Sequence, residues 1–282
     1  MAALETRIAG ALGAGVVRLV PLSGGCVGDV FRADLSDGRR VVVKAGDAGG
    51  RLDLEGWMLR TLADNQLPVP GVIHAVDDLL AMDYIETLGS LDESAQAHAA
   101  ELLAALHART APAFGLERDT LIGGLHQPNA PDKNWLAFFR DRRLLHMAGE
   151  AHRAGRLPAR TVARIEKLCA RLTDWIPADA RPSLIHGDAW GGNVLCRAGR
   201  VAAFIDPAIY YADAEIELAF GTLFGTFGRA FFRRYGELRP IRAGFFEERR
   251  DLYNLYPLLV HARLFGGGYV NDVENTLGRF GA

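Results

Sequence analysis

The chain has 282 residues, of which 49% are hydrophobic and 23% charged, and its formal net charge is −2. This near-neutral charge argues against a protein that attracts nucleic acid electrostatically, so we expect no nucleic-acid partner. The sequence shows no signal-peptide pattern and no uncharged apolar run long enough to cross a membrane. Its three cysteines lack metal-ligand spacing and are typical of a reducing compartment, so we expect a cytoplasmic protein with no membrane partner.

Predicted strands dominate the first part of the chain. Alternation of residue types between Val30 and Leu35 and between Arg40 and Ala45 predicts two strands, joined by a turn at 36–38. Helical periodicity predicts one helix before these strands and another after them. In chain order we expect a helix over 4–13, strands over 18–20, 30–35 and 40–45, a helix over 52–62, and strands over 72–76 and 79–84.

Helical patterns dominate the chain after Glu86. We expect helices over 94–109, 135–150 and 158–175, a strand–loop–strand unit over 183–206, and more helices from Glu215 onward. A strand-rich part followed by a helical part predicts an α+β fold with two lobes. The expected division is an N-terminal lobe over 1–86 and a C-terminal lobe over 87–282.

The stretch SLIHGDAWGGNVLC, over 183–196, carries the strongest chemical signal. Asp188 and Asn193 bracket four residues, which is the spacing of the catalytic loop in protein kinases. In that loop the aspartate accepts the proton of the attacking hydroxyl, and the asparagine amide is an oxygen ligand for Mg²⁺. Asp206 ends the next apolar run, where the same pattern places a second carboxylate ligand. A lone loop aspartate is more often a turn cap, but this ordered set, His186 included, favours a catalytic site.

A kinase-like site also needs groups that bind phosphates, and the first part of the chain offers them. Lys44 ends a β-branched strand and is expected to reach the phosphates of ATP. Glu55, with Asp53 as the alternative, lies in the next predicted helix and is expected to hold that lysine. Glycine turns and solvated lysines are common, so each signal alone is weak. Backbone N–H groups of the turn SGGCVG are expected to contact the phosphates, from Ser23, Gly24, Gly25 and Cys26.

The segment LLAMDYIET, over 79–87, connects the two expected lobes. Backbone groups of Asp83 and Ile85 are expected to hydrogen-bond the edge of adenine, with Met82 in the apolar position behind them. The alternative is an ordinary connection between a strand and a helix, and the side chains do not distinguish the two.

Four separated motifs resemble the fructosamine kinase (ketosamine-3-kinase) family, a protein-kinase-like group related to aminoglycoside and choline phosphotransferases. LIHGDAWGGNV is similar to the family pattern LxHGDLWxGN, with Ala189 in place of leucine. IDPAIYYADAEIELAF is similar to DPAxxYGxxExELA, with Ala212 and Asp213 as mild departures. LSGGCVGDVFRA is similar to the cysteine-containing phosphate loop of the family, and NWLAFFRDRRL resembles its WxxFFxxxRL helix. The resemblance covers nearly the whole chain.

The resemblance implies that ATP, with Mg²⁺, phosphorylates a sugar hydroxyl of a ketosamine, a small molecule or a glycated amine. It implies Asp188 as the base and Asn193 and Asp206 as the metal ligands. Trp190 distinguishes this family from most aminoglycoside kinases and is expected to contact the substrate through the apolar face of its sugar. His186 is also expected on the substrate side of the loop, although a hydrogen-bonding role in holding the loop is the stronger interpretation.

Two further sets of residues have no settled role in the sequence. Glu215 and Glu217 lie at the start of a predicted helix, where carboxylates are favourable, and we interpret them as structural. His261 is expected either to face the acceptor or to pack internally. The sequence is compatible with a monomer or a homodimer.

Two alternatives remain beside a ketosamine kinase, and a third, a dinucleotide-binding protein, is rejected. The nearest is another small-molecule kinase with the same fold, acting on an aminoglycoside, choline or homoserine. A nucleotide-binding regulator without activity is less compatible with the complete set of Lys44, Asp188, Asn193 and Asp206. A dinucleotide-binding turn at SGGCVG would lead into a helix, whereas the residues after Gly28 indicate a strand.

We expect Cys26 to be the most oxidisable thiol and a candidate redox switch. It lies within the predicted phosphate turn, whose N–H groups favour a thiolate, and an accessible thiolate oxidises first. Peroxide should therefore lower activity reversibly in the wild type, through a disulfide between the Cys26 residues of two chains, and should spare Cys26→Ala. Activity and non-reducing gel mobility, followed before and after a thiol reductant, check this expectation. Equal and irreversible loss in both proteins contradicts it.

Overall fold

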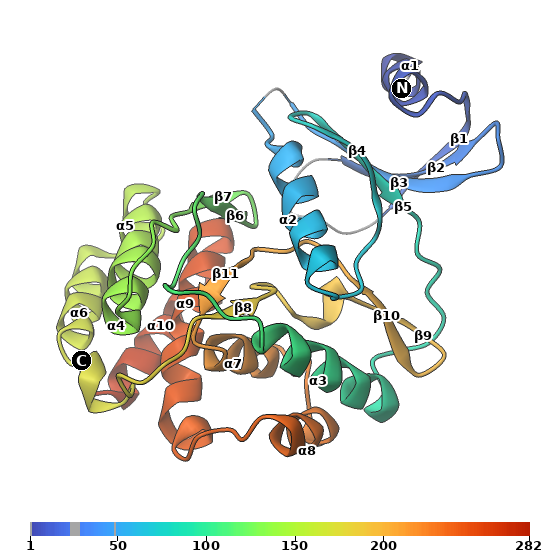
Figure 1. Ribbon diagram of the computed structural model, residues 1–282. Coiled ribbons are helices and arrows are strands. Elements are labelled where there is room, and N and C mark those ends of the chain that lie inside the picture. Colours follow the sequence, from blue (N-terminus) through green and yellow to red (C-terminus); the bar gives the residue numbers. More distant parts are fainter. Residues whose placement is uncertain (1, 23–28, 48) are drawn as a thin grey trace.

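An antiparallel sheet of five strands, in the order β1-β2-β3-β5-β4, forms the smaller lobe (Figure 1). The computed structural model describes residues 2–22, 29–47 and 49–282 of the chain. The predicted turn residues Ser23, Gly24, Gly25 and Cys26 lie outside the described residues. The strands are β1 (Val16–Pro21), β2 (Asp29–Leu35), β3 (Arg40–Ala45), β4 (Val72–Val76) and β5 (Leu79–Asp83).

The alternation of side chains along β3 determines which residues reach each face of this sheet. Val41 and Val43 join a cluster with Ile8 of helix α1 (Ala2–Leu12). Val42 lies on the opposite face, packed against the cluster under helix α2 (Leu52–Asp64). Because side chains alternate along a strand, Lys44 shares the α2 face with Val42.

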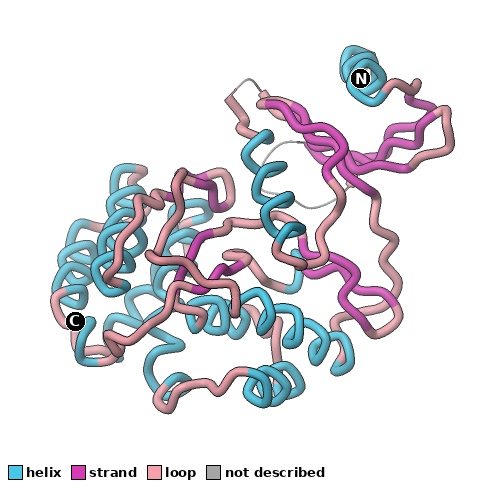
Figure 2. Tube along the Cα trace, viewed as in Figure 1, coloured by secondary structure: helices cyan, strands magenta, loops and turns pink. Residues whose placement is uncertain are grey.

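Helices make up most of the larger lobe, and Figure 2 shows the short strands embedded among them. Its α-helices are α3 (Glu93–His107), α4 (Trp135–Phe138), α5 (His146–Arg153), α6 (Ala159–Cys169), α7 (Glu215–Leu223), α8 (Arg229–Leu238), α9 (Arg250–Phe265) and α10 (Gly268–Arg279). Wider π-helical turns, η1 (Phe139–Leu145) and η4 (Phe245–Arg249), precede α5 and α9, and short 3₁₀ turns are η2 (Leu172–Asp174) and η3 (Gly191–Asn193). Two-stranded pairs are β6 (Thr120–Ile122) with β7 (Leu125–Gln127), β8 (Ser183–Ile185) with β11 (Tyr210–Ala212), and β9 (Val194–Arg197) with β10 (Arg200–Phe204).

The structure confirms the two-lobed α+β fold and adds one strand to the predicted strand–loop–strand unit. Strand β9 follows the loop directly and pairs with β10, with Arg197 opposite Arg200. Ala198 and Gly199, at φ values of 51° and 70°, make the two-residue turn between them. Alanine rarely adopts this backbone conformation. The Ala-Gly pair therefore differs from the Asn-Gly pair that usually marks such a hairpin turn in a sequence. The five-stranded sheet lies within 1–86 and the helices from α3 to α10 lie within 87–282, while the exact division at residue 86 stays a prediction.

Backbone hydrogen bonds attach the connecting segment and the smaller lobe to the β9–β10 hairpin of the larger lobe. The connecting segment is held by the β9–β10 hairpin, since the Leu88 N–H donates to the Cys196 carbonyl at 3.0 Å and the Ala198 N–H donates to the Leu88 carbonyl at 3.1 Å. After the end of α2, the Pro68 carbonyl accepts the Phe204 N–H of β10 at 2.8 Å. The end of β10 is therefore tied directly to the loop between α2 and β4.

The two described cysteines are buried in the larger lobe. Burial raises the pKa of the Cys169 thiol to about 12 and also raises the pKa of Cys196. Neither of these two thiols is therefore readily deprotonated to the reactive thiolate. The role of Cys26 stays a prediction. Among the helices in the described residues, none combines the length and apolar character needed to cross a membrane.

The close packing of α2 on β4 predicts that Gly56→Ala destabilises the protein. A Cβ atom at position 56 would lie 2.6 Å from the Ala75 Cβ, so α2 must move away from the sheet. We expect a loss of about 1–3 kcal/mol in the free energy of unfolding, measured by urea denaturation.

Gly10→Ala in α1 is the matched control, because a Cβ atom there meets no atom within 4 Å. Relief of the helical glycine should stabilise the protein by roughly 0.5–1 kcal/mol. Equal effects of the two substitutions would show that packing against β4 is not the cause.

Candidate active site

Lys44 joins the two lobes through a buried ionic contact. Its side chain leaves β3 on the α2 face, and the residue is only 5% exposed. Its Nζ donates to Glu55 Oε1 at 2.7 Å and to Asp206 Oδ1 at 2.5 Å. Burial opposes the charged amine, but the two carboxylates outweigh it and raise the pKa of Lys44 above its usual value. The prediction that Glu55 holds this lysine agrees with the geometry, whereas Asp53 makes no such contact.

Asp188 and Asn193 meet in the loop between β8 and β9. The Asn193 Nδ2 donates to both the Asp188 carbonyl and Asp188 Oδ2, each at 2.9 Å. These bonds use the amide nitrogen, so the Asn193 Oδ1 is the atom left to bind a ligand. Burial and the nearby charge of Asp206 raise the pKa of Asp188 well above its usual value, against the lowering effect of the Asn193 hydrogen bond.

Asp206 follows β10 in a left-handed backbone conformation, with φ of 54°. This conformation reverses the chain direction at the cleft and leaves Asp206 Oδ1 on Lys44. Gly187, at φ of 86°, allows a second close approach, since a Cβ atom there would overlap the Ala208 carbonyl oxygen. The backbone at Gly187, next to Asp188, thus packs directly against the backbone at Ala208, two residues after Asp206.

Glu217 of α7 binds the backbone of the loop between β8 and β9, a role that the sequence did not reveal. Its carboxylate accepts the backbone N–H groups of His186 at 3.1 Å and Gly187 at 2.6 Å. It also contacts His107 Nε2 of α3 at 2.9 Å, and His107 Nδ1 contacts the Tyr235 hydroxyl of α8 at 2.8 Å. Burial favours a protonated carboxyl, but the bonds from His107 and the backbone hold the pKa of Glu217 below its usual value. Glu217 therefore does more than begin a helix, because it also binds the backbone of the loop that carries Asp188.

His186 does not lie on the substrate side of the loop, which corrects that expectation. Its ring is fully buried beside Phe204, and its Nδ1 accepts the Asp188 N–H at 3.3 Å. Burial lowers the pKa of His186 below its usual value, so the ring is neutral. Its contact is with the loop backbone, in agreement with the hydrogen-bonding interpretation.

A cleft opens between the lobes beside these residues. Its apolar wall includes Met82, and the connecting segment contributes Asp83 and Ile85. The Asp83 N–H is already bonded to the Gly71 carbonyl at 2.9 Å, which leaves its carbonyl for other contacts. Lys44 and Asp206 lie at the inner end of the cleft. Among the described residues, those predicted to contact adenine and metal thus line one cleft together with Lys44.

Trp190 also lines this cleft, and it is 40% exposed. Its ring covers Gly192, where a Cβ atom would overlap the indole, and meets Phe224 edge-on at 6.1 Å between ring centroids. A smaller hollow beside the cleft brings Trp190 together with Asp188, Asn193 and Asp206. Its expected contact with the substrate stays a prediction.

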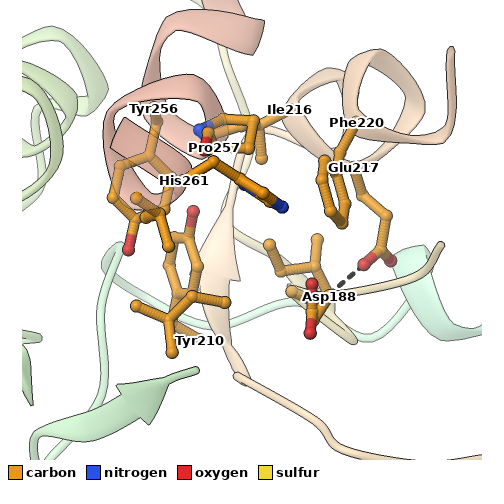
Figure 3. Close-up of a pocket in the computed structure, with 12 residues that line it drawn as sticks. Asp188, Tyr210, Ile216, Glu217, Phe220, Tyr256, Pro257 and His261 are labelled. Carbon is orange, nitrogen blue, oxygen red and sulfur yellow. Dashed lines mark hydrogen bonds between the residues drawn. The ribbon is translucent and has the colours of Figure 1, made fainter. Parts of the chain in front are cut away.

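A second pocket lies on the other side of Asp188, among α7, α9 and β11 (Figure 3). Tyr210, Tyr256 and Phe220 form aromatic walls, and the His261 ring points into the space that Asp188 faces. The His261 Nδ1 contacts the Pro257 carbonyl at 2.8 Å, and burial lowers the pKa of the ring. The walls of the pocket are therefore mostly apolar, and Asp188 contributes a carboxylate to them. We name it the acceptor pocket.

Glu217→Gln tests whether this carboxylate holds the catalytic loop. A glutamine has one acceptor oxygen and presents an N–H₂ group to backbone donors, so one buried N–H loses its partner. We expect the backbone amides of His186 and Gly187 to exchange with deuterium at least tenfold faster, and the free energy of unfolding to fall by roughly 1–3 kcal/mol.

Glu237→Gln on the exposed surface of α8 is the control, and it should leave the exchange of these amides unchanged. Wild-type exchange rates in Glu217→Gln would show that other contacts hold the loop.

Known proteins share both the sequence and the fold of this chain. A family model described as fructosamine kinase matches residues 7–280. A protein from Synechocystis named as a ketoamine kinase is 40% identical over 177 residues, which span 62% of this chain and 58% of that protein. A crystal structure assigned as a fructosamine-3-kinase from Thermobifida fusca superposes with a TM-score of 0.88, at 30% identity and 99% coverage of both chains.

The fold extends to more distant phosphotransferases. A thermostable mutant of an aminoglycoside phosphotransferase, in a ternary complex with ADP and hygromycin B, superposes with a TM-score of 0.66 over 98% of this chain and 96% of that one. At 20% identity this likeness concerns the fold alone. With a family match over almost its whole length, the chain belongs to the fructosamine kinase family of ATP-dependent phosphotransferases.

Proposed function

We propose that this protein transfers the γ-phosphoryl group of ATP to a sugar hydroxyl of a ketosamine. One observation carries the proposal: Asp188 lines both the smaller hollow, which it shares with Lys44 and Asp206, and the separate acceptor pocket. A phosphoryl transferase needs this arrangement, because its base must meet the acceptor where the acceptor meets the terminal phosphate. The names of the relatives supply the ketosamine as the acceptor class.

Binding of the nucleotide follows from the cleft. Adenine would lie against Met82 and hydrogen-bond the Asp83 carbonyl and the Ile85 N–H. Lys44, oriented by Glu55, would neutralise charge on the phosphates, and backbone groups of Ser23, Gly24, Gly25 and Cys26 are proposed to cover them. Most of the catalytic effect in such a site comes from positioning and charge neutralisation.

The donor set fits Mg²⁺. Asn193 Oδ1 and the Asp206 carboxylate are hard oxygen donors in one cleft, and Mg²⁺ prefers such ligands together with phosphate oxygens. When bound, the ion would neutralise phosphate charge during transfer. The amide of Asn193 is turned toward this role, because its nitrogen is bonded to Asp188.

Asp188 would accept the proton of the attacking hydroxyl. Its carboxylate lines the acceptor pocket, and its raised pKa makes it a stronger base than an exposed aspartate. The His261 ring points at the same space and would contact the acceptor there. Trp190 would flank the sugar from the phosphate side of Asp188.

The acceptor pocket favours a ketosamine over a polycationic antibiotic. Among the residues that line it, the carboxylates are Asp188 and Glu217, and Glu217 is occupied by backbone N–H groups. An acceptor with several ammonium groups would meet a single available carboxylate. Coupled measurement of ADP release with ATP and Mg²⁺ should therefore show turnover of fructosamines and little of kanamycin. Turnover of kanamycin or choline alone would overturn the ketosamine assignment and leave the kinase assignment intact.

Asp188→Asn should retain nucleotide binding and lose turnover. An amide cannot accept the hydroxyl proton, and loss of a general base costs about 10²–10⁴-fold in kcat. Steady-state kinetics measure the loss, and calorimetry measures ATP affinity in the same variant. Asp206→Asn is the comparison, because it should weaken Mg²⁺-dependent ATP binding first. Near-normal turnover in Asp188→Asn would remove Asp188 from the role of base.

A further inference from the structure

A fully buried arginine lies under the acceptor pocket. Arg143 belongs to the π-helical turn η1 and has no exposed surface. Its guanidinium carbon lies 3.8 Å from the centroid of the Tyr210 ring, 4.7 Å from that of Phe138 and 5.4 Å from that of Tyr256. The cation is therefore surrounded by aromatic rings.

Every hydrogen-bond partner of this guanidinium is neutral. Its Nη1 donates to the carbonyls of Pro128 at 2.7 Å and Arg142 at 2.9 Å, and its Nη2 donates to Asn129 Oδ1 at 2.7 Å. Its Nε–H has no hydrogen-bond partner, and none of the bonds that its other nitrogens make within the described residues goes to a carboxylate. Because arginine stays charged in proteins, this site holds an uncompensated positive charge.

Two of the surrounding rings are also walls of the acceptor pocket. Tyr210 and Tyr256 line it together with Asp188 (Figure 3). Burial raises the pKa of both phenols despite the opposing effect of Arg143, so neither ring supplies a negative charge. The Tyr256 hydroxyl instead donates to Gln127 Oε1 at 2.7 Å.

The charges that act on a molecule in the pocket are therefore few. Glu217 is compensated by backbone N–H groups and His107, and burial keeps His261 neutral. Asp188, which lines the pocket, and Arg143, which lies against its Tyr210 and Tyr256 walls, remain. Charges act over longer distances in a buried site than in water, so Arg143 offsets the attraction of Asp188 for cations.

We propose that Arg143 is a specificity-determining residue. Its positive charge makes the acceptor pocket favour ketosamines whose amine part carries a carboxylate, such as those formed from free amino acids. The inference rests on the proposed function and names its substrate class more closely. A carboxylate on the amine part would be attracted through the aromatic wall, whereas additional ammonium groups would be repelled.

Two acceptors that differ only in one charge test the proposal: N-fructosylglycine and N-fructosylglycinamide. The ratio of their kcat/KM values should favour the carboxylate by about tenfold in the wild type, the size of one partly screened charge–charge interaction. Arg143→Met should abolish the preference, and Arg143→Lys should retain most of it because the charge remains. Arg142→Met is the matched control: its side chain is exposed, and it should behave as the wild type.

The outcomes separate charge from packing. Equal loss of the preference in Arg143→Met and Arg143→Lys would assign a packing role and overturn the proposal. Equal efficiency of the two acceptors in the wild type would also overturn it, whether or not the variants fold, as judged by thermal unfolding. If neither acceptor is phosphorylated, the proposed function fails. Calorimetric binding of the two acceptors then decides separately whether the pocket prefers the carboxylate.

Discussion

The ionic contact of Lys44 with Glu55 and Asp206 is the constraint on which the site depends. It joins three elements that are far apart in the sequence: a central strand, the helix that packs on it and the end of β10 in the other lobe. A buried ammonium is tolerable only with close counter-charges, so any movement of α2 or of Asp206 exposes the cost of an unpaired charge. The position of α2 on the sheet is therefore as important to the site as the charged groups themselves.

The catalytic loop depends on a different kind of support, which comes from main-chain hydrogen bonding. Glu217 binds two consecutive N–H groups of the loop, and Asn193 binds the carbonyl and carboxylate of Asp188. Helix α7 supplies Glu217, and α3 and α8 support that carboxylate through His107 and Tyr235. The smaller lobe thus supplies Lys44 and Glu55, and the larger lobe supplies the loop that positions Asp188 and Asn193.

The sequence predicted those features that local patterns encode. Strand β3 and Lys44 follow from the alternation in RVVVKA, and the spacing of Asp188 and Asn193 follows from covalent chemistry within one loop. The roles of His186, Glu217 and Arg143 depend on which face of a loop or helix is buried, and this is set by distant segments. The β9–β10 hairpin was missed because Ala198 occupies a backbone conformation that usually requires glycine or asparagine. A buried arginine in particular has no sequence signal, since most arginines are exposed.

The backbone attachments of the connecting segment and of the smaller lobe to the larger lobe have a mechanical consequence. A body fixed to another at two points moves most easily by rotation about the line through them. Here one point is the Leu88 pairing with the hairpin and the other is the bond from Phe204 to Pro68. In the larger lobe both points belong to the β9–β10 hairpin, so an axis of rotation between the lobes would run along this hairpin. Its length and twist set the axis about which the cleft would widen or narrow.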